Sequence, residues 1–286
     1  MTILFTISLT KLLRLGSLLA AGSMAACVCA QDAREIVRKS VELDQSNWRR
    51  MKDYTWKARS TERHFDGGGK VKSTEGSAWE TLVLDGEPYR LMTERNGKPL
   101  SAPEQRKEQD KLDKNVAKLA RETPEQKERR LREYELQRKK DRDFLREIPA
   151  AYDVRLEGEE QVDGHKTWVI VGTPKPGYQA KDRDAKALLK ISGKLWVDEA
   201  TYQWVRVEAE TTETISFGLV LARLNAGSKL IFEQTPVAID LWLPRRLYMK
   251  GAGRVGLVKK ISVDEEILWN NYRKFQVDSK IVPLAP

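Results

Sequence analysis

The sequence predicts a mainly β protein with helices, built on one large, curved antiparallel sheet. From Tyr152 to about Val277, strand-like runs follow one another, and polar turn signals such as Asp163-Gly164 separate them. Three more strand-like stretches lie between residues 54 and 95. The total is roughly a dozen strands, more than the usual sheet of about four to six. So large an antiparallel sheet must curl, and curling around a helix is one way to cover its inner face.

Residues 1–30 have the features of a signal peptide. Lys11 and Arg14 precede an apolar run whose end, Val28-Cys29-Ala30, has small residues where signal peptidase requires them. The mature chain would then comprise residues 31–286 as one β domain. An uncleaved membrane span is disfavoured, because Arg14 shortens the apolar run to below the roughly 20 residues that a span needs.

A second interpretation of this segment is a bacterial lipobox. Met24-Ala25-Ala26 precedes Cys27, which would then carry the acyl groups of a lipoprotein. Both interpretations predict an exported protein, periplasmic or associated with the outer membrane. A chain cleaved after Ala30 retains neither cysteine, which excludes disulfides and thiolate metal sites.

The charge balance is basic. The 286 residues carry a formal net charge of +9, and one third of them are charged. Behind a signal peptide, anionic membrane headgroups or acidic partners are better candidate targets than nucleic acid. A basic surface with no partner is the plainer alternative.

Residues 32–51 predict an amphipathic helix that Asp32 caps. Lys and Arg occupy its polar face, and core packing of the apolar face is favoured over contact with a membrane surface. The apolar face would carry Ala33, Ile36, Val37, Val41, Trp48 and Met51.

A β meander follows the helix. The turn sequences Asp66-Gly67-Gly68-Gly69, Asp85-Gly86 and Asn96-Gly97 supply the positive φ angles that tight hairpins need. Between them lie the predicted strands Tyr54–Phe65, Lys70–Leu84 and Glu87–Arg95.

Residues 101–147 predict a charged helical hairpin inserted between two strands. Ser101-Ala102-Pro103-Glu104 and Thr123-Pro124-Glu125-Gln126 are capping boxes that begin helices at about 102–121 and 124–147. The segment has 15 basic and 12 acidic residues, so its interleaved charges favour intrahelical ion pairs over a phosphate-binding stripe. No nucleic-acid partner is expected. A protein partner could dock here, or the segment could be a passive lid.

The sheet resumes after Pro149. Residues 215–224 include a single charge, Arg223, and would be either a buried strand or an exposed apolar flap. The predicted strands are Tyr152–Glu160, Lys166–Thr173, Leu188–Val197, Trp204–Thr214, Lys229–Thr235, Ala238–Leu243, Leu247–Lys250, Leu257–Val263 and Ile267–Phe275.

Sequence patterns of catalysis are lacking. His64 and His165 each lie beside a predicted turn and are interpreted as exposed residues, and no HExxH spacing is present. Glu208 and Glu210 alternate with apolar residues, as the solvent face of a strand does. There is no nucleophile elbow, P-loop or dinucleotide fingerprint, so the sequence predicts no enzyme, no cofactor and no metal site.

Tryptophan is the prominent chemical feature of the strands. Large aromatic residues on a sheet usually belong to the core, but as a set they could line a cavity for an acyl chain or an apolar peptide segment. The candidate apolar-ligand residues are Trp56, Trp79, Trp168, Trp196, Trp204, Trp242 and Trp269.

One hairpin resembles a known family. The run Gly193–Thr201 (GKLWVDEAT), followed by Trp204–Glu208 (WVRVE), is similar to a recurring element of the outer-membrane lipoprotein-sorting proteins, the LolA/LolB-like group. The order of signal peptide, helix and consecutive strands is similar too. This resemblance implies a curved half-barrel closed by helices, with an apolar interior that takes the acyl chains of lipoproteins. The charged segment 101–147 departs from the pattern of that group.

The sequence therefore predicts a non-enzymatic envelope protein that binds lipid or lipoprotein acyl chains. The alternative is a protein-interaction or sensor domain on the same scaffold, which docks through the charged helices.

Overall fold

The computed structural model describes residues 33–181, 183–217, 222–255 and 259–275. The predicted signal peptide and Cys27 lie outside these residues, as does the middle of the apolar segment 215–224. Among the helices of the described part, none combines the length and the apolar character that a membrane crossing requires.

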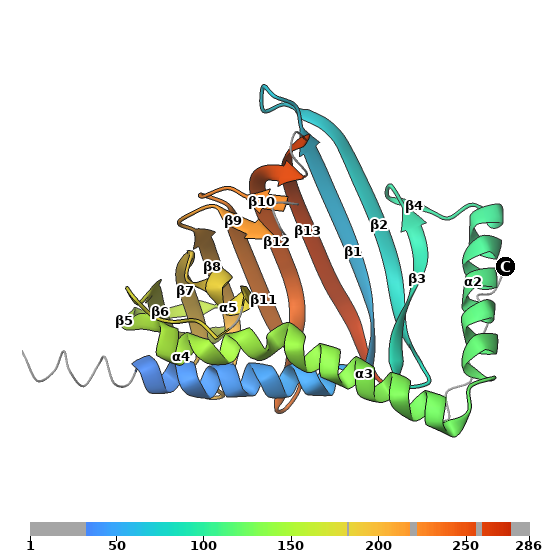
Figure 1. Ribbon diagram of the computed structural model, residues 1–286, viewed down its shortest axis with the longest axis horizontal. Coiled ribbons are helices and arrows are strands. Elements are labelled where there is room, and N and C mark those ends of the chain that lie inside the picture. Colours follow the sequence, from blue (N-terminus) through green and yellow to red (C-terminus); the bar gives the residue numbers. More distant parts are fainter. Residues whose placement is uncertain (1–32, 182, 218–221, 256–258, 276–286) are drawn as a thin grey trace, which may run out of the picture.

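The body of the protein is a single antiparallel sheet of 13 strands (Figure 1). The strands are β1 (Tyr54–Phe65), β2 (Val71–Leu84), β3 (Glu87–Arg95), β4 (Lys98–Pro99), β5 (Tyr152–Val162), β6 (His165–Pro174), β7 (Ile191–Asp198), β8 (Trp204–Thr211), β9 (Ile215–Phe217), β10 (Ala222–Leu224), β11 (Lys229–Ala238), β12 (Leu241–Val255) and β13 (Lys259–Lys274).

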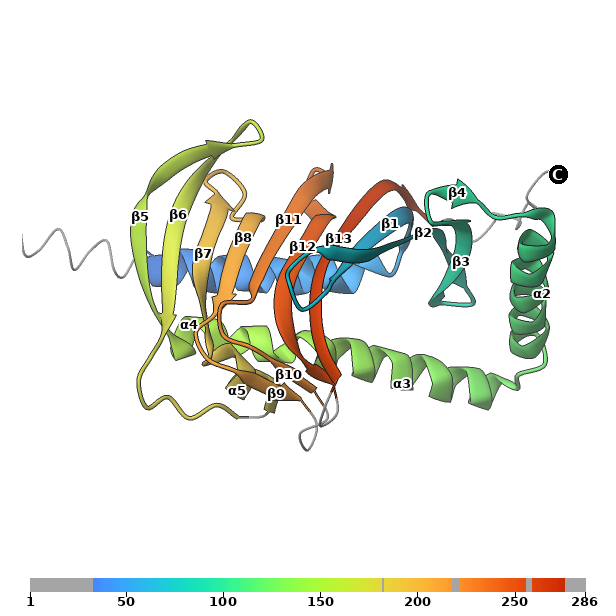
Figure 2. The same ribbon diagram turned by 90° about the horizontal axis from the view of Figure 1, so that it is seen from above.

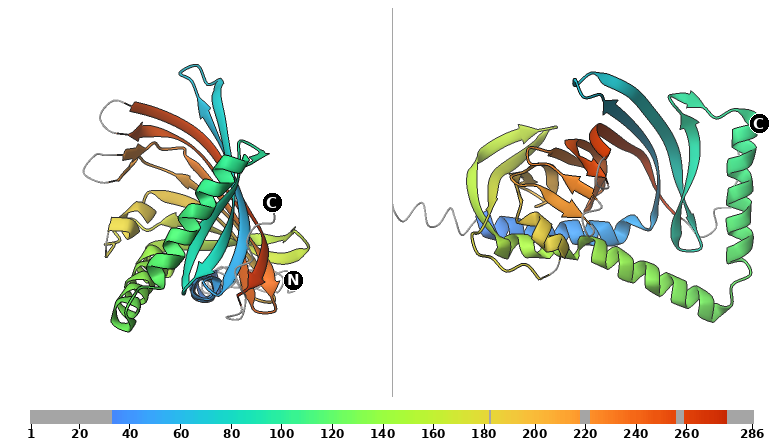
Figure 3. Two further views of the ribbon diagram at one scale, coloured as in Figure 1. Left: turned by 90° about the vertical axis from the view of Figure 1, so that its right-hand side faces the viewer. Right: turned by 45° about the horizontal axis from the view of Figure 1, so that its top comes forward.

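The order across the sheet is β4-β3-β2-β1-β13-β12-β11-β8-β7-β6-β5, and β10 joins β9 to β12. The two edges, β4 and β5, do not pair with each other. The sheet is therefore an open, curved sheet and not a closed barrel, as Figures 2 and 3 show. This confirms the predicted fold class.

Two predicted strands are continuous in the structure. Residues 238–243 and 247–250 were expected as separate strands on either side of Pro244, but both belong to β12. Pro244 pairs with Gln234 directly beside a register shift, where the regular ladder is interrupted and the missing N–H of proline costs little. At the other end of the sheet, residues predicted to begin a strand at Leu188 instead close the short helix α5 (Arg183–Leu188).

The N-terminal helix (residues 33–51, blue in Figure 1) lies against the concave face of the sheet. The predicted apolar stripe packs there: Ile36, Val37 and Val41 form one cluster with Ile170 and other sheet residues. Burying a side chain of this size stabilises the fold by about 1.5–3 kcal/mol. At the same contact, the Trp204 Nε1–H donates to Ser40 Oγ at 2.9 Å, which satisfies the only polar atom of the buried indole.

A second helix, α3 (Pro124–Asp143), runs antiparallel to the N-terminal helix and beside it (Figures 1 and 2). Trp48 Nε1 donates to the Arg138 carbonyl at 2.9 Å. One turn earlier in the N-terminal helix, Gln45 donates to the Arg142 carbonyl at 2.7 Å, and one turn later Lys52 contacts Glu135 at 2.5 Å. Because later residues of one helix contact earlier residues of the other, the two helices are antiparallel. After Asp143 the helical path continues through η1 (Phe144–Glu147) and α4 (Ile148–Ala151) into β5.

The other end of α3 is fixed to the β2–β3 turn by Arg130. Its guanidinium contacts Asp85 at 2.7 Å, Glu87 at 2.9 Å and Glu122 at 2.9 Å. Desolvation lowers the pKa of Arg130, but the hydrogen bonds to Glu122 and Glu87 outweigh it, and the pKa is raised overall. The second expected helix, α2 (Ala102–Leu119), stands against β3 through one buried residue, Leu112.

Three residues of the hairpin motif of β7 and β8 have folding roles: Gly193, Asp198 and Thr201. Asp198 Oδ1 accepts hydrogen bonds from the backbone N–H of Ala200 and Thr201 and from Thr201 Oγ1, which holds the turn. Gly193 lies so close to β8 that a Cβ would be 2.1 Å from the Glu208 carbonyl oxygen. These three residues therefore specify a strand–turn–strand unit.

Candidate functional site

The concave face of the sheet carries one continuous apolar row. Residues directly opposite each other in an antiparallel sheet point to the same face. Following the register from β5 to β13, the row comprises Leu156, Ile170, Leu195, Val207, Phe232, Leu247 and Ile267.

The helices cover only one half of this row. The N-terminal helix, with Leu145 and its neighbours after α3, packs on the residues from β5 to β8 and reaches Phe232 on β11. Leu247 and Ile267, farther along the row, are half-buried and belong to none of the hydrophobic clusters of the described residues. The apolar row therefore continues beyond the helical cover as far as β13, and it ends there because Ile267 pairs with Ser60 on β1.

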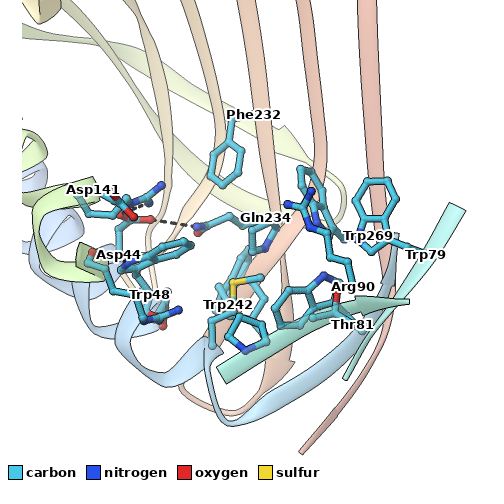
Figure 4. Close-up of a pocket in the computed structure, with 18 of the residues that line it drawn as sticks. Asp44, Trp48, Trp79, Thr81, Arg90, Asp141, Phe232, Gln234, Trp242 and Trp269 are labelled. Carbon is cyan, nitrogen blue, oxygen red and sulfur yellow. Dashed lines mark hydrogen bonds and ion pairs between the residues drawn. The ribbon is translucent and has the colours of Figure 1, made fainter. Parts of the chain in front are cut away.

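A pocket of about 400 Å³ lies where the covered half ends (Figure 4). Figure 4 shows Asp44 and Trp48 on one side of it and Trp79 and Trp269 on the other, with Gln234 between them. We call it the indole pocket, and its lining is Asp44, Asn47, Trp48, Met51, Trp56, Trp79, Thr81, Pro88, Arg90, Tyr134, Arg138, Asp141, Arg142, Phe232, Gln234, Trp242, Leu243, Pro244 and Trp269.

The sheet wall of the pocket consists of indoles set around a small residue. Ala58 pairs with Trp79 on β2 and with Trp269 on β13, so the three form one cross-strand row on the same face. Ala58 itself is 3% exposed, and the two partly buried indoles beside it line the pocket. Trp56 lies near Tyr272, with ring centroids 6.1 Å apart, and burial raises the pKa of Tyr272 above its ordinary value.

The helix wall is made by Trp48 and two arginines of α3. The guanidinium carbons of Arg138 and Arg142 lie 4.6 Å and 5.3 Å from the centroid of the Trp48 ring, within cation–π range. Arg142 also pairs with Asp44 at 2.5 Å. Tyr134 accepts a hydrogen bond from Arg138, and burial raises the pKa of its hydroxyl. This wall therefore combines the aromatic rings of Trp48 and Tyr134 with the charged guanidinium groups of Arg138 and Arg142.

Four of the seven tryptophans selected from the sequence line the pocket: Trp56, Trp79, Trp242 and Trp269. Trp242 packs in addition against Val169 and Trp196. The structure places the other three elsewhere. Trp204 is in the core under the N-terminal helix, Trp168 packs against the edge of that core beside Tyr202, and Trp196 donates from Nε1 to Glu160 at 2.9 Å.

The helix wall of the pocket is not predicted by the sequence. Arg138 and Arg142 fall in a run of charges that was expected to be a solvated helix face. A signal was present, because Leu131, Tyr134, Arg138 and Arg142 are spaced three or four residues apart and share one face of α3. Thr81 and Gln234 gave no such signal, since polar residues on strands usually face solvent.

His165 does not belong to the lining of the pocket, although its ring contacts Trp242, which does. His165 was expected to be exposed, but it is half-buried, with Nδ1 3.1 Å from Asp198 Oδ2 and its ring 4.7 Å from that of Trp242. Asp198 is already engaged in holding the β7–β8 turn, which explains the contact structurally. In the part of the chain that the structure describes, no three His, Cys, Asp or Glu side chains are grouped as a metal site would require.

Comparisons with known proteins give structural matches alone. No family model and no curated protein matches the sequence. A DUF1329 family protein from Desulfovibrio piger is 15% identical, covering 88% of this chain and 95% of its own, with a TM-score of 0.33. A LolA superfamily protein from Nitrosomonas europaea is 12% identical, covering 86% and 94%, with a TM-score of 0.31. The group that the hairpin motif resembles is thus among the matches, but TM-scores this low carry no argument about ligands.

Proposed function

We propose that this chain is a non-enzymatic, exported cell-envelope protein that binds the apolar chain of a lipid or an acylated lipoprotein in the indole pocket. The observation that carries the proposal is the indole pocket, which has tryptophan on both walls and meets the apolar row of the concave face at Phe232. Its volume of about 400 Å³ is within the range of small-ligand sites, roughly 300–1,000 Å³.

The physical basis is the removal of hydrocarbon from water. Each buried CH₂ group of a ligand contributes about 0.8 kcal/mol, so even part of an acyl chain supplies substantial binding free energy. Trp79 and Trp269 line the sheet wall of the pocket, where an apolar chain would cover their rings. The resemblance of the β7–β8 hairpin to lipoprotein-sorting proteins supports the same ligand class.

Removing one indole from the sheet wall tests the proposal. We expect delipidated protein to bind a fluorescent fatty acid, and Trp269→Ala to weaken this binding about tenfold, since an aromatic side chain of this size contributes about 1.5 kcal/mol or more when it is covered. Titration by fluorescence measures the dissociation constant.

Leu268 provides the matched control. It precedes Trp269 on β13 but points to the other face of the sheet and is 40% exposed. Leu268→Ala should therefore bind like the wild-type protein. A delipidated protein that takes up no fatty acid, or two variants with equal losses, would contradict the proposal.

Docking of a protein partner on α2 and α3 is the second candidate function. The two helices extend beyond the sheet edge (Figure 1), and Leu136 is an apolar side chain that is 53% exposed on α3. Because the helices project from the sheet, Leu136 is accessible to a partner.

A photoreactive residue at position 136 distinguishes docking from decoration. If the helices dock a partner, irradiation of intact cells should give one discrete adduct. The same probe at Val71, which is 54% exposed at the far end of β2, should give none. Diffuse labelling from both positions would leave the charged helices without a docking role.

A further inference from the structure

The polar atoms of the indole pocket specify the head of its ligand. Resting on the proposed lipid-binding function, we infer that the pocket takes an anionic amphiphile, whose carboxylate or phosphate is held by Arg138 while its chain lies along the sheet wall.

Arg138 is a buried cation without a matching anion. Arg138 is 8% exposed. Its guanidinium donates to two neutral groups, the Tyr134 hydroxyl at 3.2 Å and the Trp48 carbonyl. No carboxylate of the described residues forms an ion pair with it. Burying a charge without a counter-charge is unfavourable, so an anion arriving in the pocket would gain from this site.

The acidic residues of the lining do not supply that counter-charge. Asp44 is engaged on both oxygens, by Arg142 at 2.5 Å and by Gln234 Nε2 at 3.1 Å. Asp141 is exposed and accepts from Gln137 at 2.6 Å. Arg90, on the opposite wall, lies over the Trp79 ring at 5.1 Å and adds a second cation.

The buried polar atoms of the lining residues that have no hydrogen-bond partner are mainly donors. Eight buried side-chain atoms of the described residues have no hydrogen-bond partner, and five of them belong to residues that line the pocket. Thr81 and Gln234 are 1% and 5% exposed, so bulk water does not supply the missing hydrogen bonds. The five atoms are Trp79 Nε1, Thr81 Oγ1, Arg138 Nε, Arg142 Nε and Gln234 Oε1.

Four of these five atoms can donate a proton, and Gln234 Oε1 alone can only accept. A ligand head with several acceptor oxygens and a negative charge matches this set, whereas an ester or an alcohol offers fewer acceptors and no charge. Carboxylates and phosphates share the required chemistry, and arginine binds both through charge-assisted hydrogen bonds.

The test compares ligands that share a chain and differ in the head. Binding of a C16 fatty acid, its methyl ester and a C16 alkyl phosphate to the delipidated full chain is measured at neutral pH by competition with a fluorescent probe. We expect at least one anion to bind about tenfold or more tightly than the ester, equivalent to about 1.4 kcal/mol. The fatty acid and the phosphate arms identify which anion is preferred.

Arg138→Gln removes the cation, and Arg132→Gln is its matched control on the same helix, with a side chain 62% exposed outside the pocket. The first variant should lose the preference for anions and keep the affinity for the ester, and the second should change neither. Thermal unfolding of both variants verifies that they fold. Arg138→Lys, which restores the charge, should recover part of the preference.

The outcomes separate this inference from the proposed function. If wild-type protein binds acid, phosphate and ester equally, the inference is wrong and the lipid-binding function stands. If none of the three binds, the proposed function itself fails. An anion preference that survives in Arg138→Gln would also contradict the role given to Arg138.

Discussion

Replacing Asp44 by alanine is expected to lower the free energy of unfolding by about 3–5 kcal/mol, the cost of removing one member of a buried charge pair. Asp44 is 2% exposed and connects three elements: the N-terminal helix that carries it, α3 through Arg142, and β11 through Gln234. Without it, Arg142 and Gln234 both lose a partner in the interior. Urea unfolding followed by tryptophan fluorescence measures the change.

Glu42→Ala is the control for Asp44→Ala. Glu42 is on the same helix and pairs with Arg38 at 2.6 Å, but its side chain is 65% exposed. Solvent screens such a pair, so the change should be about 0.5 kcal/mol or less. Equal effects of the two substitutions would show that Asp44 does not connect the helices to the sheet.

Gly193→Ala is expected to destabilise the protein by about 1–3 kcal/mol or more, the cost of overpacking a filled position. The added Cβ would be 2.1 Å from the Glu208 carbonyl oxygen, and a backbone atom cannot move aside as the end of a flexible side chain can. The β7–β8 pairing must then separate locally, which affects the turn that Asp198 holds. The shift in the midpoint of thermal unfolding reports the loss.

Gly158 serves as the comparison, since an added Cβ there meets nothing within 4 Å. It lies on the edge strand β5, so Gly158→Ala should be nearly neutral. If Gly193→Ala were as mild as Gly158→Ala, the glycine of the hairpin motif would have no packing reason in this fold.

The strands of the meander were predictable because their turns have a local cause. Asp85, Asn96 and Asp163 all adopt positive φ directly before a glycine, as the dipeptides predicted. The bounds of β1 and β3 match the predicted ones for this reason. Pro244 was wrongly expected to separate two strands. It is accommodated within β12 by its pairing with β11, which local sequence patterns do not show.

The indole pocket was only partly predictable, because it depends on contacts between distant segments. The strand periodicity placed Trp79 and Trp269 on one face, but their common row requires the pairing of β1 with β13, which are about 200 residues apart in the chain. The tryptophans outside the pocket have the same local pattern. No pattern within α3 could show that Arg138 faces Trp48, since that contact depends on where the N-terminal helix lies.

The placement of α3 has a mechanical consequence. The helix is joined through η1 and α4 to one edge strand, β5, and Arg130 fastens its other end to the β2–β3 turn near the opposite edge. Its 20 residues measure about 30 Å, and because a helix hardly stretches, α3 is a rigid connection between the two edges of the curved sheet. The length of α3 limits how far the sheet can straighten. Straightening of the sheet would therefore require one end of α3 to detach, and at the Arg130 end the ion pairs with Asp85 and Glu87 would have to break.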